Sequence, residues 1–327
     1  MKLAAIFPVL VLVLALSAPA GATPWEWRLP PGVPVPAVPA DNPMSVEKVE
    51  LGRRLFHDPR LSGNGTVSCA SCHFQSLAFS DGRALSPGAT GRLTHRNAPG
   101  LLNLAWMLSY TWANPALTSL ERQAEVPLFG DDPVEMGVSD ANREEIVERL
   151  RADAEYPARF EAAFPGQSPL IGFHSIIMAL ASYQRSLISE PARYDRALAG
   201  DLALTDGEAR GMALFFSREA RCSECHGGFA FTDHVRGRAA TYHDAAIHGL
   251  ANPAYPNRGL FELSGNPVDL NRFRASSLRE IGRTAPYMHD GRYPDLATVL
   301  RNYAPRHFTE AEIEDLRDFL LALDSER

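Results

Sequence analysis

Apolar residues recur at helical spacing in four stretches of the chain. The first, residues 46–56, predicts a helix that ends at the Pro and Gly residues of 57–65. In the second, residues 173–188, one helix face collects an apolar stripe: Phe173, Ile176, Ile177, Leu180, Leu187 and Ile188. No run of alternating apolar and polar residues indicates a strand. We therefore expect a mainly α fold.

The other two stretches begin with a capping box, in which a Thr and a Glu three residues later satisfy each other's backbone N–H groups. The boxes are Thr205 with Glu208 and Thr309 with Glu312. In the helix predicted over 205–216, we place the apolar stripe on Met212, Ala213 and Phe216. In the final helix, we expect four buried positions: Ile313, Leu316, Leu320 and Leu323.

The first 22 residues have the pattern of an export signal. Lys2 is followed by an apolar run over 3–16 and by small residues at 18, 20 and 22. That run is shorter than the roughly 20 residues that a transmembrane helix needs, and no other stretch is long and apolar enough. We therefore expect a signal peptide over 1–22 and a mature periplasmic, soluble chain without a membrane span.

Composition narrows the class of partner. The chain has 32 Lys and Arg against 39 Asp and Glu, a formal net charge of −7. It lacks the basic excess that neutralises phosphates, so no nucleic acid partner is expected. Residues 23–44 hold seven prolines and predict an extended leader rather than a helix.

All four cysteines lie in two copies of the pattern Cys-x-x-Cys-His. The copies are Cys69, Cys72 and His73, and Cys222, Cys225 and His226. In a c-type haem site, two thiols form thioethers with the haem vinyl groups and the histidine ligates the iron. The 153 residues between the two histidines disfavour a zinc ribbon, and a thioredoxin-type pair would not need a histidine after each copy. The pattern predicts two covalently bound haem c groups.

Each haem motif follows a similar helix. The sequence "GRRLF" at 52–56 precedes the first motif and "GMALF" at 211–215 precedes the second. This indicates an internal duplication of a small helical haem domain. We expect an N-terminal cytochrome c-like domain over 45–195 and a C-terminal one over 196–327, packed with their haems near the interface. Residues 190–204 would link them.

The chain also resembles the bacterial di-haem cytochrome c peroxidase and MauG family over nearly all of its mature length. The resemblance is carried by "LGRRLFHDPRLSGNGTVSCASCH", "HRNAPGLLNLAW", "LERQAEVPLFGDDPVEMG", "CSECH" and "RTAPYMHDGRYPDL". Within the family, "PADNPMS", "TWANPAL" and "VPLFG" resemble the MbnH-like branch. The resemblance implies a peroxide-dependent oxidoreductase.

Matching the motifs implies roles for single residues. His73 matches the proximal ligand of the peroxide-binding haem, and His226 matches that of the electron-transfer haem. Trp112 matches a tryptophan between the two haems, with Trp106 as the nearby alternative. The resemblance thereby implies an electronic connection between the haems.

The same matching implies a distal pocket and a cation site. Glu135 matches the distal acid, a general acid/base for peroxide, and Gln123 and Pro127 line the same pocket. The ligands of a structural Ca²⁺ ion between the lobes match Asn97, Thr284 and Pro286.

The sixth ligand of the second haem separates the family's branches. Peroxidases of the family place Met there, whereas MauG-like members place Tyr. Tyr303 lies 77 residues after His226 and fits the family spacing, and Met288, 62 residues after His226, is the competing ligand. A phenolate donates charge to iron and lowers its potential, which favours a high-valent state.

The resemblance implies that peroxide reacts at the first haem and that both haems store its two oxidising equivalents in a bis-Fe(IV)-type state. The MbnH-like branch implies that the substrate is a tryptophan of a periplasmic copper-binding, MbnP-like partner, oxidised to kynurenine. The alternative is a di-haem cytochrome c peroxidase that takes electrons from a small cytochrome. A non-catalytic di-haem electron carrier is a third interpretation.

The route by which oxidising equivalents leave the protein stays open. MauG has a surface tryptophan shortly before its second haem motif, where this chain has Ala220. Three tyrosines near the second haem are the candidates: Tyr242, Tyr287 and Tyr293.

Overall fold

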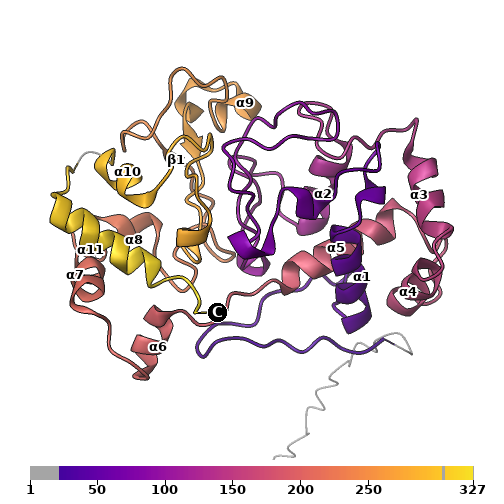
Figure 1. Ribbon diagram of the computed structural model, residues 1–327, viewed down its shortest axis with the longest axis horizontal. Coiled ribbons are helices and arrows are strands. Elements are labelled where there is room, and N and C mark those ends of the chain that lie inside the picture. Colours follow the sequence, from indigo (N-terminus) through magenta and orange to yellow (C-terminus); the bar gives the residue numbers. More distant parts are fainter. Residues whose placement is uncertain (1–21, 304–305, 327) are drawn as a thin grey trace, which may run out of the picture.

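The computed structural model describes residues 22–303 and 306–326, which form two helical lobes side by side (Figure 1). The predicted signal peptide falls, apart from its last residue, outside the described residues. The first lobe holds α1 to α5, and its helices are Val46–Phe56, Leu120–Phe129, Arg143–Arg151, Tyr156–Ala163 and Phe173–Ser186. The second lobe holds α6 to α11: Arg193–Ala199, Asp206–Phe215, Cys222–Cys225, Phe261–Ser264, Leu296–Arg301 and Glu310–Leu321.

Extended structure is sparse, so the expected mainly α fold is confirmed. The strands β1 (His243–Asp244) and β2 (Arg272–Phe273) form one short antiparallel pair. Single 3₁₀ turns shape the loops at Pro59–Leu61, Cys69–Ser71, Gln75–Leu77, Leu104–Trp106, Pro267–Asp269 and Ile281–Arg283. None of the helices in the described part of the chain is long and apolar enough to cross a membrane.

Each lobe is built on one close helix crossing. A Cβ atom at Gly52 of α1 would lie 2.0 Å from the carbonyl oxygen of Ala179 in α5. A Cβ at Gly211 of α7 would lie 1.9 Å from the carbonyl oxygen of Asp315 in α11. Only glycine permits either approach. The two crossings are equivalent, which agrees with the duplication indicated by "GRRLF" and "GMALF".

The aromatic packing around each crossing is also repeated. Phe56 follows Gly52 by four residues and contacts Tyr183 of α5 with ring centroids 5.2 Å apart. Phe215 follows Gly211 by four residues and contacts Phe319 of α11 at 5.1 Å. Both phenylalanines are fully buried, so each anchors the core of its lobe.

The predicted helix starts are confirmed, but one predicted stripe is wrong. Both capping boxes are present, at Thr205 and Thr309. In α7 the buried face holds Gly211 and Phe215, whereas Ala213 is exposed, Phe216 is 44% exposed and Met212 is partly buried. The close crossing requires the face of α7 that carries Gly211 to turn toward α11. The buried stripe therefore lies one position earlier in the sequence than the predicted one.

The leader and α6 join the lobes. The carbonyl of Pro34 in the leader accepts a hydrogen bond from Trp106 Nε1 at 2.8 Å, and the Trp106 ring contacts Phe229 of the second lobe at 5.3 Å. Within the expected link, α6 places Tyr194 against Phe319 at 5.8 Å. A small core fills the junction itself: Ala113, Tyr242, Ala245, Leu250 and Phe273.

Candidate haem sites

The first haem motif opens onto a cavity of about 670 Å³ in the first lobe, part of it open to solvent. Cys69, Cys72 and His73 form one wall. Gln123, Pro127 and Glu135 from the sequence-based prediction line the same cavity, with Phe56, Leu180 and Gln184 of the helix crossing beside them. The fold therefore brings the predicted distal residues together with the motif.

His73 is held with one ring nitrogen committed. Its Nδ1 lies 2.6 Å from the carbonyl oxygen of Phe79, and a carbonyl can only accept, so Nδ1 carries the proton. Burial lowers the pKa of His73, although this hydrogen bond acts against it. The neutral ring then offers the lone pair of Nε2, as a metal-ligating histidine must.

Glu135 is fixed by its backbone neighbours. The amide of Ala89 donates to the Glu135 carbonyl at 2.7 Å, and the amide of Met136 donates to the carbonyl of Pro127 in α2 at 2.9 Å. Burial raises the pKa of the Glu135 carboxyl above its ordinary value. A carboxyl on a fixed backbone with a raised pKa is suited to exchange a proton at a higher pH than an ordinary carboxyl.

The second haem motif opens onto a larger cavity, of about 1800 Å³ including its open mouth, at the junction between the lobes. Cys222, Cys225 and His226 line it, and so do residues 97–100 of the first lobe. The Nδ1 atom of His226 lies 3.1 Å from the carbonyl oxygen of Ser276 and 3.3 Å from that of Phe231. As at His73, Nε2 stays available.

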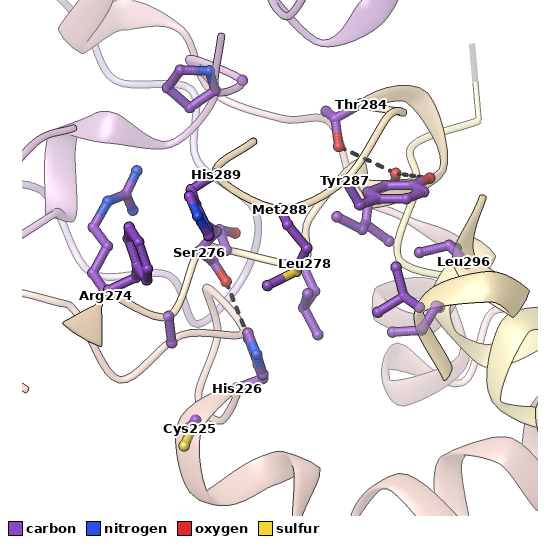
Figure 2. Close-up of a pocket in the computed structure, with 18 of the residues that line it drawn as sticks. Cys225, His226, Arg274, Ser276, Leu278, Thr284, Tyr287, Met288, His289 and Leu296 are labelled. Atoms are coloured by element: carbon purple, nitrogen blue, oxygen red, sulfur yellow. Dashed lines mark hydrogen bonds between the residues drawn. The ribbon is translucent and has the colours of Figure 1, made fainter. Parts of the chain in front are cut away.

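Both predicted candidates for the sixth ligand line this second cavity. Figure 2 shows the Met288 side chain pointing from its loop into the cavity on the side of His226. Tyr303 stacks on His248 with ring centroids 5.2 Å apart and an interplanar angle of 23°. Burial raises the pKa of the Tyr303 phenol, so it stays protonated unless a cation binds its oxygen.

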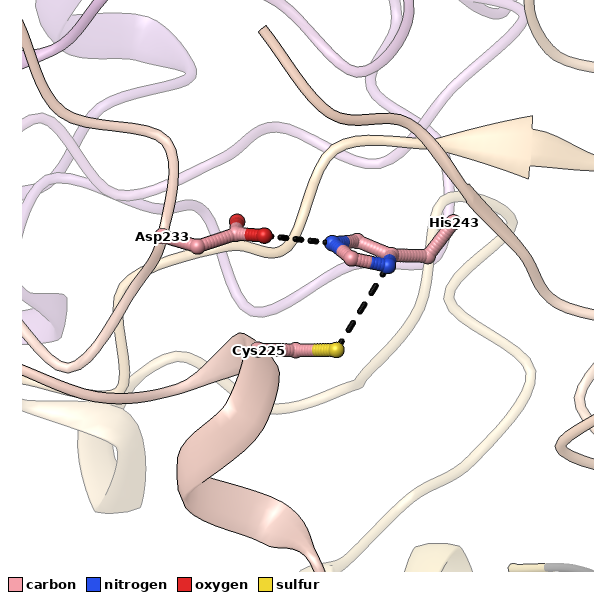
Figure 3. A group of neighbouring side chains, drawn as sticks. All are labelled: Cys225, Asp233 and His243. Carbon is pink, nitrogen blue, oxygen red and sulfur yellow. Dashed lines mark hydrogen bonds and ion pairs between the residues drawn. The ribbon is translucent and has the colours of Figure 1, made fainter. Parts of the chain in front are cut away.

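A His–Asp pair stands beside the second attachment cysteine (Figure 3). Nε2 of His243 lies 2.7 Å from Asp233 Oδ2, and its Nδ1 lies 3.4 Å from Cys225 Sγ. The hydrogen bond to Asp233 and the contact with Cys225 raise the pKa of His243 to about 10. These three ligand-type side chains lie close enough to hold a metal ion, but Cys225 belongs to a haem attachment pair. We therefore treat the group as part of the second haem site.

The residues around the cavities fit covalent haem. All four cysteines are free and half-buried. Arg274 lines the second cavity and is 7% exposed, yet among the described residues no carboxylate pairs with it, and its Nε donates to the carbonyl of Thr111. A buried, unpaired guanidinium is costly unless an anion joins it. Haem supplies such anions in its propionates.

The predicted tryptophan and cation ligands also line the second cavity. Trp112 Nε1 donates to the carbonyl of Asn97 at 2.8 Å, and the Trp112 carbonyl accepts from the amide of Arg274 at 3.0 Å. Both tryptophans thus contact the second lobe, but Trp112 lines the second cavity, whereas the alternative Trp106 lies under the leader. Asn97, Thr284 and Pro286 line the same cavity.

Comparison with known proteins fits this geometry. The family model described as di-haem cytochrome c peroxidase matches residues 46–203. The methylamine utilization protein MauG of Methylorubrum extorquens is 37% identical over 316 residues, covering 92% of this chain and 84% of MauG. The chain belongs to the di-haem cytochrome c peroxidase and MauG family. Cytochrome-c peroxidase IdrP1 of Denitromonas iodatirespirans is 34% identical and covers 95% of this chain and 91% of its own length.

Solved structures agree with the family assignment. One, described as a MauG-like protein associated with microbial copper homeostasis, matches with a TM-score of 0.88 and 46% identity. It covers 92% of this chain and 96% of its own. The di-haem peroxidase BthA of Burkholderia thailandensis matches with a TM-score of 0.69 at 23% identity, which supports the fold alone. As a family member, the protein is a peroxide-dependent oxidoreductase with two haem c groups.

Two features of the site were missed in the sequence. They are the guanidinium of Arg274 and the pair of His243 and Asp233, which come from segments without a helical pattern, with His243 in β1. Only the fold brings Arg274 and His243 to the cavity.

Proposed function

We propose that this di-haem enzyme uses hydrogen peroxide to oxidise a residue of a periplasmic partner protein, namely a tryptophan that becomes kynurenine. The observation that carries the proposal is the phenol of Tyr303 in the wall of the second cavity. The similarity at 46% identity to a MauG-like protein associated with microbial copper homeostasis supports an MbnP-like, copper-binding partner.

The bound haems supply an iron that reacts with peroxide in the first cavity and an iron that holds the second oxidising equivalent in the other. Glu135 takes the proton from the peroxide oxygen that binds, and returns it to the oxygen that leaves as water. Its raised pKa makes the carboxylate a stronger base for the uptake step. Gln123 and Pro127 shape the space around it, and Pro127 has no N–H to donate to the Gln123 carbonyl inside α2.

Trp112 carries charge between the two cavities in this proposal. Its indole N–H bonds to the Asn97 carbonyl and its backbone carbonyl to the Arg274 amide, so its position is fixed. Asn97 donates its Nδ2 to the Arg83 carbonyl at 2.7 Å, which leaves its amide oxygen for a cation. With Thr284 and Pro286 it would hold Ca²⁺, which prefers oxygen ligands.

The chemistry balances with peroxide as the oxidant. Two molecules of peroxide remove four electrons and four protons from a tryptophan and become four water molecules. Two waters supply the oxygen atoms of N-formylkynurenine, and hydrolysis then releases formate and leaves kynurenine. Because only electrons have to reach the haem sites, the substrate can be a whole protein. We also propose that residues 1–22 are an export signal and that the mature chain divides into one haem domain over 45–195 and another over 196–327.

One observation favours the conventional peroxidase. The Met288 side chain points into the second cavity on the side of His226, so a thioether ligand is available there (Figure 2). With such a ligand the second haem has a higher potential and accepts electrons from a small cytochrome.

Titration of the fully oxidised protein with peroxide tests the proposal. We expect a long-lived species, two electrons more oxidised than the resting state, without any prior reduction. A protein that reacts with peroxide only after partial reduction, and then oxidises a reduced cytochrome, would be a conventional peroxidase instead. No fast spectral change in either state would indicate an electron carrier.

A further inference from the structure

We propose that oxidising equivalents leave this protein at Tyr255, through a line of aromatic rings that runs from Trp112 over His289. The proposal rests on the proposed function, because it requires oxidation of a partner outside the cavities. It names the surface residue at which the partner would give up its electrons. No sequence pattern pointed to Tyr255.

The rings form a continuous chain from the cavity to the surface. The Trp112 and His289 rings contact each other edge to face, with centroids 6.4 Å apart. The His289 and Tyr255 rings do the same at 5.7 Å. His289 is 2% exposed and stacks on Phe273 at 3.9 Å, so the middle of the chain is buried and closely packed. Electron transfer is fastest through closely packed matter, since electronic coupling falls steeply with distance.

One backbone segment of the first lobe bonds to all three residues of the relay. The Asn97 carbonyl accepts from the Trp112 indole, and the Asn97 amide donates to the carbonyl of His289 at 2.8 Å. The Tyr255 hydroxyl donates to the carbonyl of His95. The relay therefore crosses the junction between the lobes with its geometry set by hydrogen bonds, not by packing alone.

The surroundings of Tyr255 suit a terminal donor. The ring is half-buried, and its neighbours Pro253, Ala254 and Pro256 are exposed, so an outside residue can approach it. Burial raises the pKa of its phenol, and the nearby Asp290 carboxylate adds to this effect, whereas the Arg96 guanidinium opposes it. A negative charge next to the ring stabilises the electron-deficient state through simple electrostatics.

The three tyrosines proposed from the sequence fit this role less well. Tyr242 and Tyr287 are buried, and their hydroxyls bond to Ser109 and to the Ile281 carbonyl at 2.9 Å each. Tyr293 is half-buried, but the guanidinium of Arg292 lies 4.8 Å from its ring centroid. A cation over the ring face opposes removal of an electron from that ring.

Each transfer balances in charge and protons. Tyr255 passes one electron inward and releases its phenolic proton to solvent. The partner residue then gives Tyr255 one electron, and the phenol recovers a proton. Hydrogen peroxide accepts two such electrons and two protons and becomes two molecules of water.

Radical trapping in the holoenzyme tests this exit route. We would treat the oxidised holoenzyme with one equivalent of peroxide and a nitroso spin trap that couples to tyrosyl radicals, and locate the adduct by peptide mass spectrometry. We expect the adduct on Tyr255. Tyr255→Phe should lose it, and Trp112→Phe should lose it although Tyr255 is still present. The matched control Tyr293→Phe should keep the adduct on Tyr255.

The absorption spectrum of the same samples distinguishes a failure of the exit route from a failure of the proposed function. If the peroxide-oxidised species forms but the adduct lies elsewhere, or persists unchanged in Tyr255→Phe, the exit route is wrong and the proposed function stands. If no oxidised species forms in the unmodified enzyme, the proposed function fails and the exit route fails with it.

Discussion

The two haem cavities have similar walls on the side of the motif histidine and differ in the residues of the opposite wall. In both, a glycine crossing, a buried phenylalanine and a histidine with its Nδ1 on a backbone carbonyl form the frame. The remaining wall of the first cavity carries the carboxyl of Glu135. The remaining wall of the second carries a phenol and a thioether, from Tyr303 and Met288.

This difference indicates which residues give the two haem sites different roles. A duplicated frame gives both haems the same attachment and the same proximal ligand, so neither can account for distinct roles. A carboxyl is a poor partner for haem iron in a small cavity but a good proton carrier, whereas a phenolate or thioether can close the coordination sphere. In the proposed function, it is therefore the distal residues that distinguish the peroxide-reactive site from the electron-storing one.

The largest effect should come from removing the acid of the first cavity. Glu135→Gln keeps the size of the side chain but cannot accept the peroxide proton, so the rate of reaction with peroxide should fall about 10²–10⁴-fold. Stopped-flow absorbance measures this rate. The control Glu125→Gln alters an exposed acid of the same region and should leave the rate unchanged. An unaltered rate in Glu135→Gln would remove the assigned role.

The pH dependence follows from the same carboxyl. Because burial raises the pKa of Glu135, its proton-accepting form is lost at a higher pH than for an ordinary carboxyl. The rate should therefore fall as the pH drops through this raised pKa. The fall should be missing in Glu135→Gln.

A second comparison concerns the charges that join the helices of each lobe. In the first lobe Arg185, 4% exposed, pairs with Glu121 at 2.7 Å, and Lys48 is buried nearby. In the second lobe the pair of Arg210 and Asp315 lies at the surface. Glu121→Gln should lower the free energy of unfolding by about 3–5 kcal/mol because it leaves buried cations unpaired. Arg210→Ala should have no measurable effect, and denaturant titration compares the two.

The stabilising effect of Glu121 should depend on pH. Burial alone would raise its pKa, but the charge of Arg185 and the hydrogen bonds from Asn42 and Arg185 outweigh burial and lower it. Its contribution is thus present above the pKa of the unfolded chain and disappears as the pH falls through the lowered folded pKa. Equal stability losses at neutral and strongly acidic pH would contradict this account.

The two crossings should respond alike to a single added methyl group. Gly52→Ala and Gly211→Ala each place a Cβ within 2.0 Å of a backbone carbonyl oxygen, and each should cost about 1–3 kcal/mol or more. Gly172→Ala is the control, because its Cβ would meet the nearest atom only at 3.9 Å. Thermal unfolding checks all three. A tolerated substitution at one crossing alone would show that the frames are not equivalent.

The smallest expected effect discriminates the two candidate ligands. Tyr303→Phe removes only the phenol oxygen and should change the spectrum of one haem, leaving the fold intact. Met288→Leu should leave that spectrum as it is. The reverse result would assign the position to Met288 and favour the conventional peroxidase.

Local sequence patterns were enough to predict much of the fold. The helix predicted over 46–56 has these bounds in the structure, because a Ser cap precedes it and the Pro and Gly residues end it. The capping boxes located two further helix starts. The stripe on Met212, Ala213 and Phe216 was wrong because tertiary packing, set by Gly211, decides which face of α7 is buried.

For the sites, the sequence predicted some residues and missed others. The haem motifs identify their own chemistry, and the resemblance led to Glu135, Gln123 and Pro127, which the structure brings to one cavity. Tyr255 and Arg274 could not be found this way. Their roles depend on what lies next to them across the lobe junction, and no local pattern encodes that contact.

The proposed function requires one asymmetry, namely that the first haem keeps an open distal side while Tyr303 closes the second. Electron paramagnetic resonance of the resting enzyme tests it directly. We expect one high-spin and one low-spin ferric signal in equal amounts, and Tyr303→Phe should alter only the low-spin signal. Two low-spin signals in the resting enzyme would contradict the account.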